Sequence, residues 1–213
     1  MSIKAAIFDM DGTLLDSMGI YETVYHDTLR ALGVEPNERL REDMRPLSGN
    51  ENIAYFKREY VLPQSLEEIS AELDKQLLAF YSTTPQLKNG VAEFLEMLAS
   101  RGIPMCVATA TNRIHVEAAL ERTRIAHYFK RIYTCAEENT GKQTPEIFER
   151  AAAFMNAAPQ DTCVFEDAHH AVETAKKAGF RVVGIADEFS AEHRTEIIAA
   201  AHEFHEDFAG IVV

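Results

Sequence analysis

The sequence has few of the residues that mark fibrous, disordered or disulfide-bonded chains. Its 213 residues include only 7 prolines, 10 glycines and 3 cysteines, whereas 46% are hydrophobic and 26% are charged. This composition is that of an ordinary globular protein, and the length allows one or two domains with a sizeable core. Cys106, Cys135 and Cys163 lie in apolar runs without CxxC spacing. We therefore expect buried free thiols, not a disulfide framework or a zinc site.

Long apolar segments and basic clusters are also missing. No apolar run approaches the length of a membrane span, and Asp9 interrupts the N-terminus before a signal-peptide core could form. The 34 acidic and 21 basic side chains leave a net charge of −13, which repels nucleic acids and anionic lipids. We expect a cytoplasmic protein that binds neither nucleic acid nor membranes. The oligomeric state stays open, and a monomer is compatible with the sequence.

Short apolar runs rich in β-branched residues alternate with helical patterns along most of the chain. Strands are expected at residues 3–8, 103–109, 131–135, 162–166 and 181–185. The later strands are separated by helical patterns, several of which are closed by glycine. This alternation predicts an α/β fold with a Rossmann-like parallel sheet and helices on both of its faces.

One long segment interrupts the alternation. From Met18 to about Pro85 the sequence shows helical patterns without a convincing strand, and the last of them opens with the capping box Ser65-Leu66-Glu67-Glu68. An insert of this length is expected to be functional, for instance as a lid. We therefore predict a core domain of residues 1–17 and 85–213 and an inserted α-helical cap domain of residues 18–84.

Polar side chains stand at or just after the ends of several of the expected strands. They are Asp9, Asp11, Thr109, Glu166 and Asp167, together with Lys142 in a loop ahead of a helix. Taken separately, each is explained as a turn, a helix cap or a solvated loop residue. In an open parallel sheet, however, ligands bind beyond the carboxyl ends of the strands. The fold would therefore gather four carboxylates, a lysine and a hydroxyl in one crevice.

Such a group of carboxylates needs shared protons or a cation. Two like charges about 4 Å apart repel each other by roughly 4 kcal/mol at an effective dielectric constant near 20. A ligand set made of oxygen atoms suits Mg²⁺, which usually keeps several waters and completes its shell with substrate phosphate. We therefore expect a Mg²⁺ site at this edge of the sheet.

The order of these motifs resembles that of the haloacid dehalogenase superfamily. DMDGT at residues 9–13 is followed by Thr109, Lys142 and Glu166-Asp167 over nearly the whole chain. The similarity is greatest to the branch with a helical cap after the first strand, which includes phosphoglycolate phosphatase and β-phosphoglucomutase. The resemblance implies that Asp9 attacks phosphorus to form an aspartyl-phosphate. It also implies that Asp11 protonates the leaving alcohol and then deprotonates the attacking water.

The resemblance further implies two ligand sets. Thr109, the backbone N–H of Ala110 and Lys142 would hold the phosphoryl oxygens. Mg²⁺ would bind Asp9, the Asp11 carbonyl oxygen and Asp167, with Glu166 in direct contact or acting through water.

Three residues of the insert are candidate substrate contacts: Tyr21, Arg45 and Ser48. For Arg45 and Ser48 a solvated helix connection is an equally good explanation. Tyr21 stands where the related mutases carry a histidine that handles a sugar, which disfavours the mutase alternative.

Two flanking sequences depart from the family pattern. Lys142 is followed by Gln143-Thr144-Pro145 instead of Pro-x-Pro, and Asp167 is followed by Ala168-His169-His170-Ala171 instead of Ser-x-x-Gly. We expect differences in loop stiffness and in hydrogen bonding beside the ligands, but not in the reaction class.

The leading hypothesis is a Mg²⁺-dependent phosphatase for small phosphorylated metabolites of the sugar phosphate or phosphoglycolate type. One alternative is a phosphoryl transferase of the mutase kind. A second alternative is a non-catalytic protein that binds phosphorylated metabolites, although such a protein has no use for Asp11 as a proton donor.

Two histidine pairs are weaker signals for metal binding. His169 and His170 are neighbours on an expected helix, so they point in different directions and one is expected to face solvent. His202 and His205 have a spacing that can chelate a metal, but we expect an exposed acidic helix face there.

Overall fold

The computed structural model describes residues 3–44 and 50–212. The chain divides into two compact units, one made of Met1–Met18 and Thr84–Val213 and the other of Gly19–Thr83. The assignment of the second unit as a cap that contacts substrate stays a prediction. No helix among the described residues is both long enough and apolar enough to cross a membrane.

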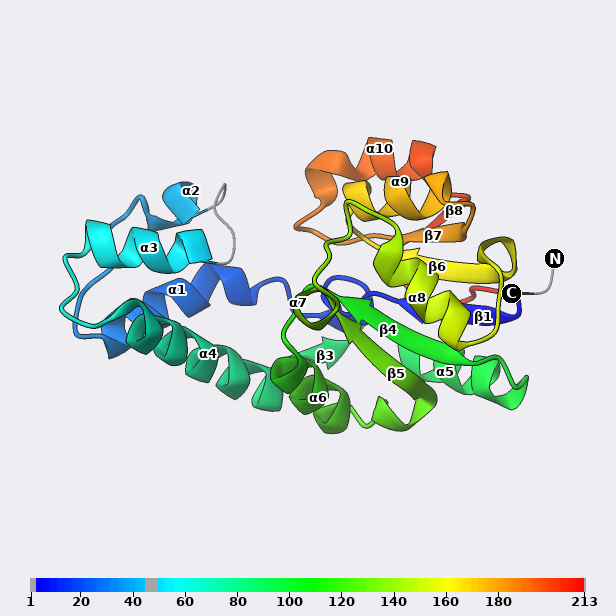
Figure 1. Cartoon of the computed structure of the whole chain (residues 1–213), viewed down its shortest axis with the longest axis horizontal. Helices are drawn as coiled ribbons and strands as arrows, with labels where there is room; N and C mark the ends of the chain where they lie inside the picture. The colour runs from blue at the N-terminus through cyan, green and yellow to red at the C-terminus, as the bar shows by residue number, and fades with distance from the viewer. Residues whose placement is uncertain (1–2, 45–49, 213) are drawn as a thin grey trace. The chain divides into compact units, whose positions relative to one another are not determined.

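A six-stranded sheet forms the centre of the first unit, in the order β5-β4-β1-β6-β7-β8 (Figure 1). The strands are β1 (Ala5–Phe8), β4 (Met105–Thr109), β5 (Phe129–Thr134), β6 (Thr162–Glu166), β7 (Arg181–Ile185) and β8 (Glu203–His205). All neighbouring strands pair in parallel. β1 lies between β4 and β6, so the strand order reverses at β1, and its carboxyl end is the switch point where such sheets bind ligands. The α/β fold predicted from the sequence is confirmed.

Helices cover both faces of this sheet. One face packs against α8 (Glu146–Phe154), α9 (His169–Lys177) and α10 (Arg194–Ala200) and contains Ile7 and Val164. On the opposite face Phe94 of α5 (Val91–Ser100) packs against Phe8 and Phe165. Successive residues of a strand point to opposite faces, so a strand buried on both sides is apolar throughout. This explains why β1 and β6 were recognisable in the sequence.

The remaining elements of the first unit are short or connect the strands. They are α6 (Arg113–Arg122), α7 (Cys135–Glu138), η1 (Ala126–Tyr128), η2 (Pro159–Asp161) and η3 (Ala191–His193). Strands β2 (Leu15–Asp16) and β3 (Gln86–Leu87) form a separate antiparallel pair. This pair was not predicted from the sequence, because two-residue strands carry no periodicity.

The expectation of a helix around His202 and His205 was wrong. Residues Glu203–His205 form β8, which pairs in parallel with β7 at the edge of the sheet. The Val182 N–H donates to Nδ1 of His202 at 3.1 Å, which extends the contact between the two segments. At Gly184 a Cβ would lie only 3.0 Å from the Phe204 ring. Glycine at this position therefore leaves the space that the Phe204 ring occupies on the sheet.

The described part of the second unit is helical. It contains α1 (Ile20–Ala31), α2 (Leu40–Met44), α3 (Asn50–Glu59) and α4 (Leu66–Thr83). Leu29, Leu40, Phe56 and Ile69 are buried together in its core. The predicted capping box is confirmed, because the Ser65 N–H donates to Glu68 Oε2 at 2.7 Å and the Glu68 N–H donates to Ser65 Oγ at 3.1 Å.

Candidate active site

The chain turns sharply where β1 ends. Asp9 follows Phe8 directly, and its backbone N–H donates to the Phe165 carbonyl oxygen at 3.0 Å. Gly12 has a φ of +79°, a conformation that glycine adopts readily and other residues rarely do. A Cβ at Gly12 would lie 2.6 Å from Oδ2 of Asp167. Glycine at this position therefore permits both the turn and the close approach of the β1 loop to Asp167.

Three buried carboxylates gather at this turn. Asp9, Glu166 and Asp167 each offer a ligand oxygen, and these atoms lie within 4.8 Å of one another. Lys142 is only 6% exposed. Its Nζ donates to Oδ1 of Asp9 and, at 2.6 Å, to Oε1 of Glu166. One ammonium group does not neutralise three carboxylates. The group can therefore accept a further positive charge, such as a metal ion.

Burial and mutual repulsion shift the pKa values of this group. Burial raises the pKa of Asp9 to about 6, although the Lys142 ammonium acts in the opposite direction. The pKa of Asp167 is raised well above its usual range by burial and by the carboxylates of Glu166 and Asp9. Burial alone would lower the pKa of Lys142, but the Asp9 and Glu166 carboxylates outweigh it and raise that pKa. A divalent cation bound by oxygen would relieve the repulsion, so the donor set fits Mg²⁺.

Hydrogen bonds orient the two acidic side chains at the carboxyl end of β6. The buried Thr13 hydroxyl donates to Oδ1 of Asp167 at 3.1 Å. Oε2 of Glu166 accepts the Ala168 N–H at 2.8 Å, while its Oε1 accepts from Lys142. Both carboxylate oxygens of Glu166 therefore have protein donors.

Asp11 is held by two hydroxyl groups. Ser17 Oγ donates to Oδ1 of Asp11, and Thr111 Oγ1 donates to Oδ2, each at 2.6 Å. The Thr111 N–H in turn donates to Oγ1 of Thr109 at 3.1 Å. These contacts connect the loop after β1 to the loop after β4. Ser17 and Thr111 were not predicted as site residues from the sequence, because no local pattern links either residue to Asp11.

The residues predicted from the sequence fall into three groups. Asp9, Glu166 and Asp167 place ligand oxygens within 4.8 Å of one another, and Lys142 contacts Asp9 and Glu166. Asp11 lies in the loop after β1, Thr109 is the last residue of β4 and Ala110 follows it, and Thr111 donates to both Asp11 and Thr109. Tyr21 belongs to the second unit, where its ring packs against Tyr25 with the centroids 6.3 Å apart. Arg45 and Ser48 lie outside the described residues.

Neither histidine at the start of α9 is among the grouped metal-ligand atoms of the described residues. The ring of His169 stacks on that of His193 with the centroids 5.8 Å apart. His170 is exposed, as expected for one member of the pair.

The three cysteines are free thiols. Cys106 and Cys163 are fully buried, as predicted, whereas Cys135 at the start of α7 is partly exposed. Burial raises the pKa of Cys106 to about 11 and that of Cys163 to about 12. Both thiols are therefore protonated at neutral pH.

A family match covers most of the chain. Residues 3–179 match the family of hydrolases described as haloacid dehalogenase-like hydrolase. This chain therefore belongs to the haloacid dehalogenase-like hydrolase family, as its motifs indicated. It is an enzyme of the hydrolase class.

Several similar proteins are named as phosphatases. A phosphorylated carbohydrates phosphatase of Thermotoga maritima is 28% identical over 184 residues, which are 86% of this chain and 85% of that protein. (DL)-glycerol-3-phosphatase 2 of Arabidopsis thaliana is 31% identical over 195 residues, covering 87% of this chain and 80% of that protein.

A solved structure of similar fold contains a sugar bisphosphate. It is a CbbY variant from Rhodobacter sphaeroides in complex with xylulose-(1,5)-bisphosphate, with a TM-score of 0.80 and 26% identity. The match covers 98% of this chain and 96% of that chain.

Proposed function

We propose that this protein is a Mg²⁺-dependent phosphatase that hydrolyses small phosphorylated metabolites through an aspartyl-phosphate on Asp9. The observation that carries the proposal is the buried group of Asp9, Lys142 and Asp167 at the carboxyl end of β1. The similarity to phosphatases of phosphorylated carbohydrates and of glycerol 3-phosphate supports a substrate of the sugar phosphate type. Phosphoglycolate is a second candidate.

Asp9, Asp167 and the Asp11 carbonyl oxygen are the groups that would hold Mg²⁺. When bound, the ion supplies positive charge to the phosphoryl oxygens and to the carboxylates. The Thr13 hydroxyl orients Asp167 for this role. Glu166 supports the site through Lys142, because both of its carboxylate oxygens accept hydrogen bonds from the protein.

The side chains supply the remaining chemistry. The Asp9 carboxylate attacks phosphorus, and the bond from phosphorus to the alcohol oxygen breaks as Asp11 gives that oxygen its proton. Asp11 then takes a proton from water, and the water oxygen attacks phosphorus and releases Asp9. Two moderate displacements replace a single difficult one. The Thr109 hydroxyl, the Ala110 N–H and Lys142 bind the phosphoryl oxygens, which carry the negative charge of the transition state.

Hydrolysis of p-nitrophenyl phosphate tests the proposal. With Mg²⁺ we expect turnover by the wild type and a loss of more than about 10³-fold in Asp9→Asn or after removal of the metal with EDTA. Asp161→Asn is the matched control, since Asp161 pairs with Lys4 at the amino end of β6. It should keep the wild-type rate. Robust turnover by Asp9→Asn, or in EDTA, would contradict the proposal.

Phosphorus NMR separates hydrolysis from the alternatives. The wild type incubated with sugar phosphates, phosphoglycolate and Mg²⁺ should release inorganic phosphate. An isomerised sugar phosphate would instead identify a mutase, and binding without phosphate release would identify a phosphometabolite-binding protein.

A further inference from the structure

Lys142 reaches the buried site from a loop at the surface. The loop occupies residues 139–145, between α7 and α8. The neighbouring side chains of Gln143 and Thr144 are exposed, whereas Lys142 is only 6% exposed. A lysine side chain is long and flexible, and the residues after Lys142 are not those of the Pro-x-Pro pattern. The position of the Lys142 ammonium group therefore depends on how this loop is held.

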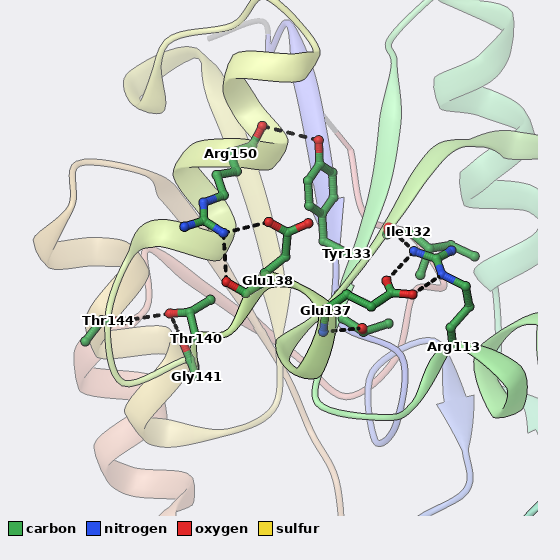
Figure 2. A network of polar contacts seen from close by, with 10 residues as sticks. Arg113, Ile132, Tyr133, Glu137, Glu138, Thr140, Gly141, Thr144 and Arg150 are labelled. Carbon is green, nitrogen blue, oxygen red and sulfur yellow. Dashed lines mark hydrogen bonds and ion pairs between the residues drawn. The ribbon is translucent and has the colours of Figure 1, made fainter.

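Two contacts cross the base of the loop (Figure 2). The hydroxyls of Thr140 and Thr144 lie 3.1 Å apart and connect the residues two before and two after Lys142. Farther out, Nη1 of Arg150 on α8 donates to the backbone oxygen of Glu138 at 2.8 Å and to its Oε2 at 2.7 Å. We refer to these two contacts, between Thr140 and Thr144 and between Glu138 and Arg150, as the loop clasp.

Helix α7, which precedes the loop, is also held by hydrogen bonds on the side opposite to Arg150. Arg113 donates to the Glu137 carboxylate from Nε at 2.6 Å and from Nη2 at 2.5 Å, and Nη2 also donates to the Ile132 oxygen at 3.0 Å. The Thr134 hydroxyl caps α7 by accepting the Glu137 N–H at 3.2 Å. Figure 2 shows that these contacts and the Arg150 contacts lie on opposite sides of α7. The clasp therefore connects the loop to an anchored segment.

We propose that the four residues of the loop clasp are positioning residues that hold Lys142 in place for phosphoryl transfer. The catalytic part of this inference rests on the proposed function. Without the clasp the loop has more accessible conformations, so the ammonium group spends less time at Asp9. Small displacements of a charged group that acts on the transition state reduce kcat strongly. Contacts between exposed groups, by contrast, contribute little to stability.

Variants of the clasp test this role through the rate of p-nitrophenyl phosphate hydrolysis with Mg²⁺. Thr144→Val keeps the shape of the side chain but loses the hydroxyl. Arg150→Met removes both hydrogen bonds to Glu138. Each should lower kcat about tenfold while Tm changes little. Thr144→Ser retains the hydroxyl and should restore kcat.

Two matched controls lose the same kinds of contact elsewhere. Thr123→Val removes a hydroxyl that donates to the Ala119 oxygen at 2.7 Å. Arg181→Met removes an ion pair with Glu203 at the amino end of β7. Both should keep the wild-type kcat.

A second measurement does not depend on activity. Acetylation of lysines by acetic anhydride, followed by mass spectrometry, reports how accessible Lys142 is. Its labelling should be slow in the wild type and in both controls, relative to the exposed Lys130, and several-fold faster in Thr144→Val and Arg150→Met.

The two measurements separate the two proposals. A wild type that hydrolyses no phosphate ester contradicts the proposed function but leaves the labelling test of the clasp intact. The clasp inference is overturned if both clasp variants keep the wild-type kcat and the wild-type labelling of Lys142, whether or not Tm falls.

Discussion

Replacing Gly12 by alanine tests how closely the β1 loop approaches Asp167. The φ of Gly12 is +79°, where a residue with a side chain costs roughly 1–2 kcal/mol. The added Cβ would lie 2.6 Å from Oδ2 of Asp167 and 2.9 Å from its Cγ. Asp167 must then move, and the loss of its hydrogen bond from Thr13 costs about 1 kcal/mol more. The combined loss of about 2–3 kcal/mol corresponds to a fall in Tm of roughly 4–12 °C for a chain of this length.

Calorimetry of three alanine variants separates the backbone cost of the positive φ from the cost of displacing Asp167. Gly102 has a φ of +70° and nothing within 4 Å of the added Cβ, so Gly102→Ala should show the backbone cost alone. Gly19 has a φ of −58° and open space around it, so Gly19→Ala should cause no loss. Gly12→Ala should also need more Mg²⁺ for half-maximal phosphatase activity. A Tm equal to that of Gly102→Ala, together with an unchanged Mg²⁺ requirement, would refute the close contact with Asp167.

The buried lysine, the hydroxyls at Asp11 and the thiols provide further tests. Lys142→Met leaves Asp9 without its cation, so urea unfolding should show a free energy of unfolding lower by about 3–5 kcal/mol; unchanged stability would argue against the ion pair. Thr111→Val removes a donor to Asp11 and should lower kcat about tenfold with little change in KM, whereas Thr111→Ser should restore it; equal kcat values would exclude this role. Burial raises the pKa of Cys163 to about 12, whereas a cysteine in the unfolded chain has a pKa near 8.5. The protonated thiol therefore contributes to stability in full below about pH 8.5, and this contribution is lost as the pH rises through about 12. Native Cys163 should therefore resist a thiol reagent at pH 8 that modifies the urea-unfolded chain, and equal rates would contradict its burial.

The hydrophobic pattern of the sequence was sufficient to predict the strands that are buried on both faces. β1 reads as a continuous apolar run because Ile7 and Phe8 contact helices on opposite sides of the sheet. β8 gave no such signal, since Phe204 is the one apolar residue of its three. Its position depends on pairing with β7 and on the space above Gly184. The pairing partner and Gly184 both belong to β7, which is a separate segment of the sequence.

The candidate site was predictable to different extents. The proximity of Asp9, Glu166 and Asp167 followed from the sequence, because the carboxyl ends of parallel strands meet at one edge of the sheet. The contact between Thr111 and Asp11 did not follow, since no local pattern links two residues that are 100 positions apart in the chain. The candidate substrate contacts of the second unit stay predictions.

By itself, the sequence of this protein determined the type of fold and which acidic residues and lysine could act together. It could do so because apolar runs specify buried strands, and because the acidic motif residues stand at the ends of those strands. Only the tertiary structure decided how these side chains are held: Asp11 by two hydroxyls, Asp167 by Thr13, and the Lys142 loop by contacts across its base. Hydrogen bonds between side chains depend on where folding places them, so they leave no periodic pattern in the sequence.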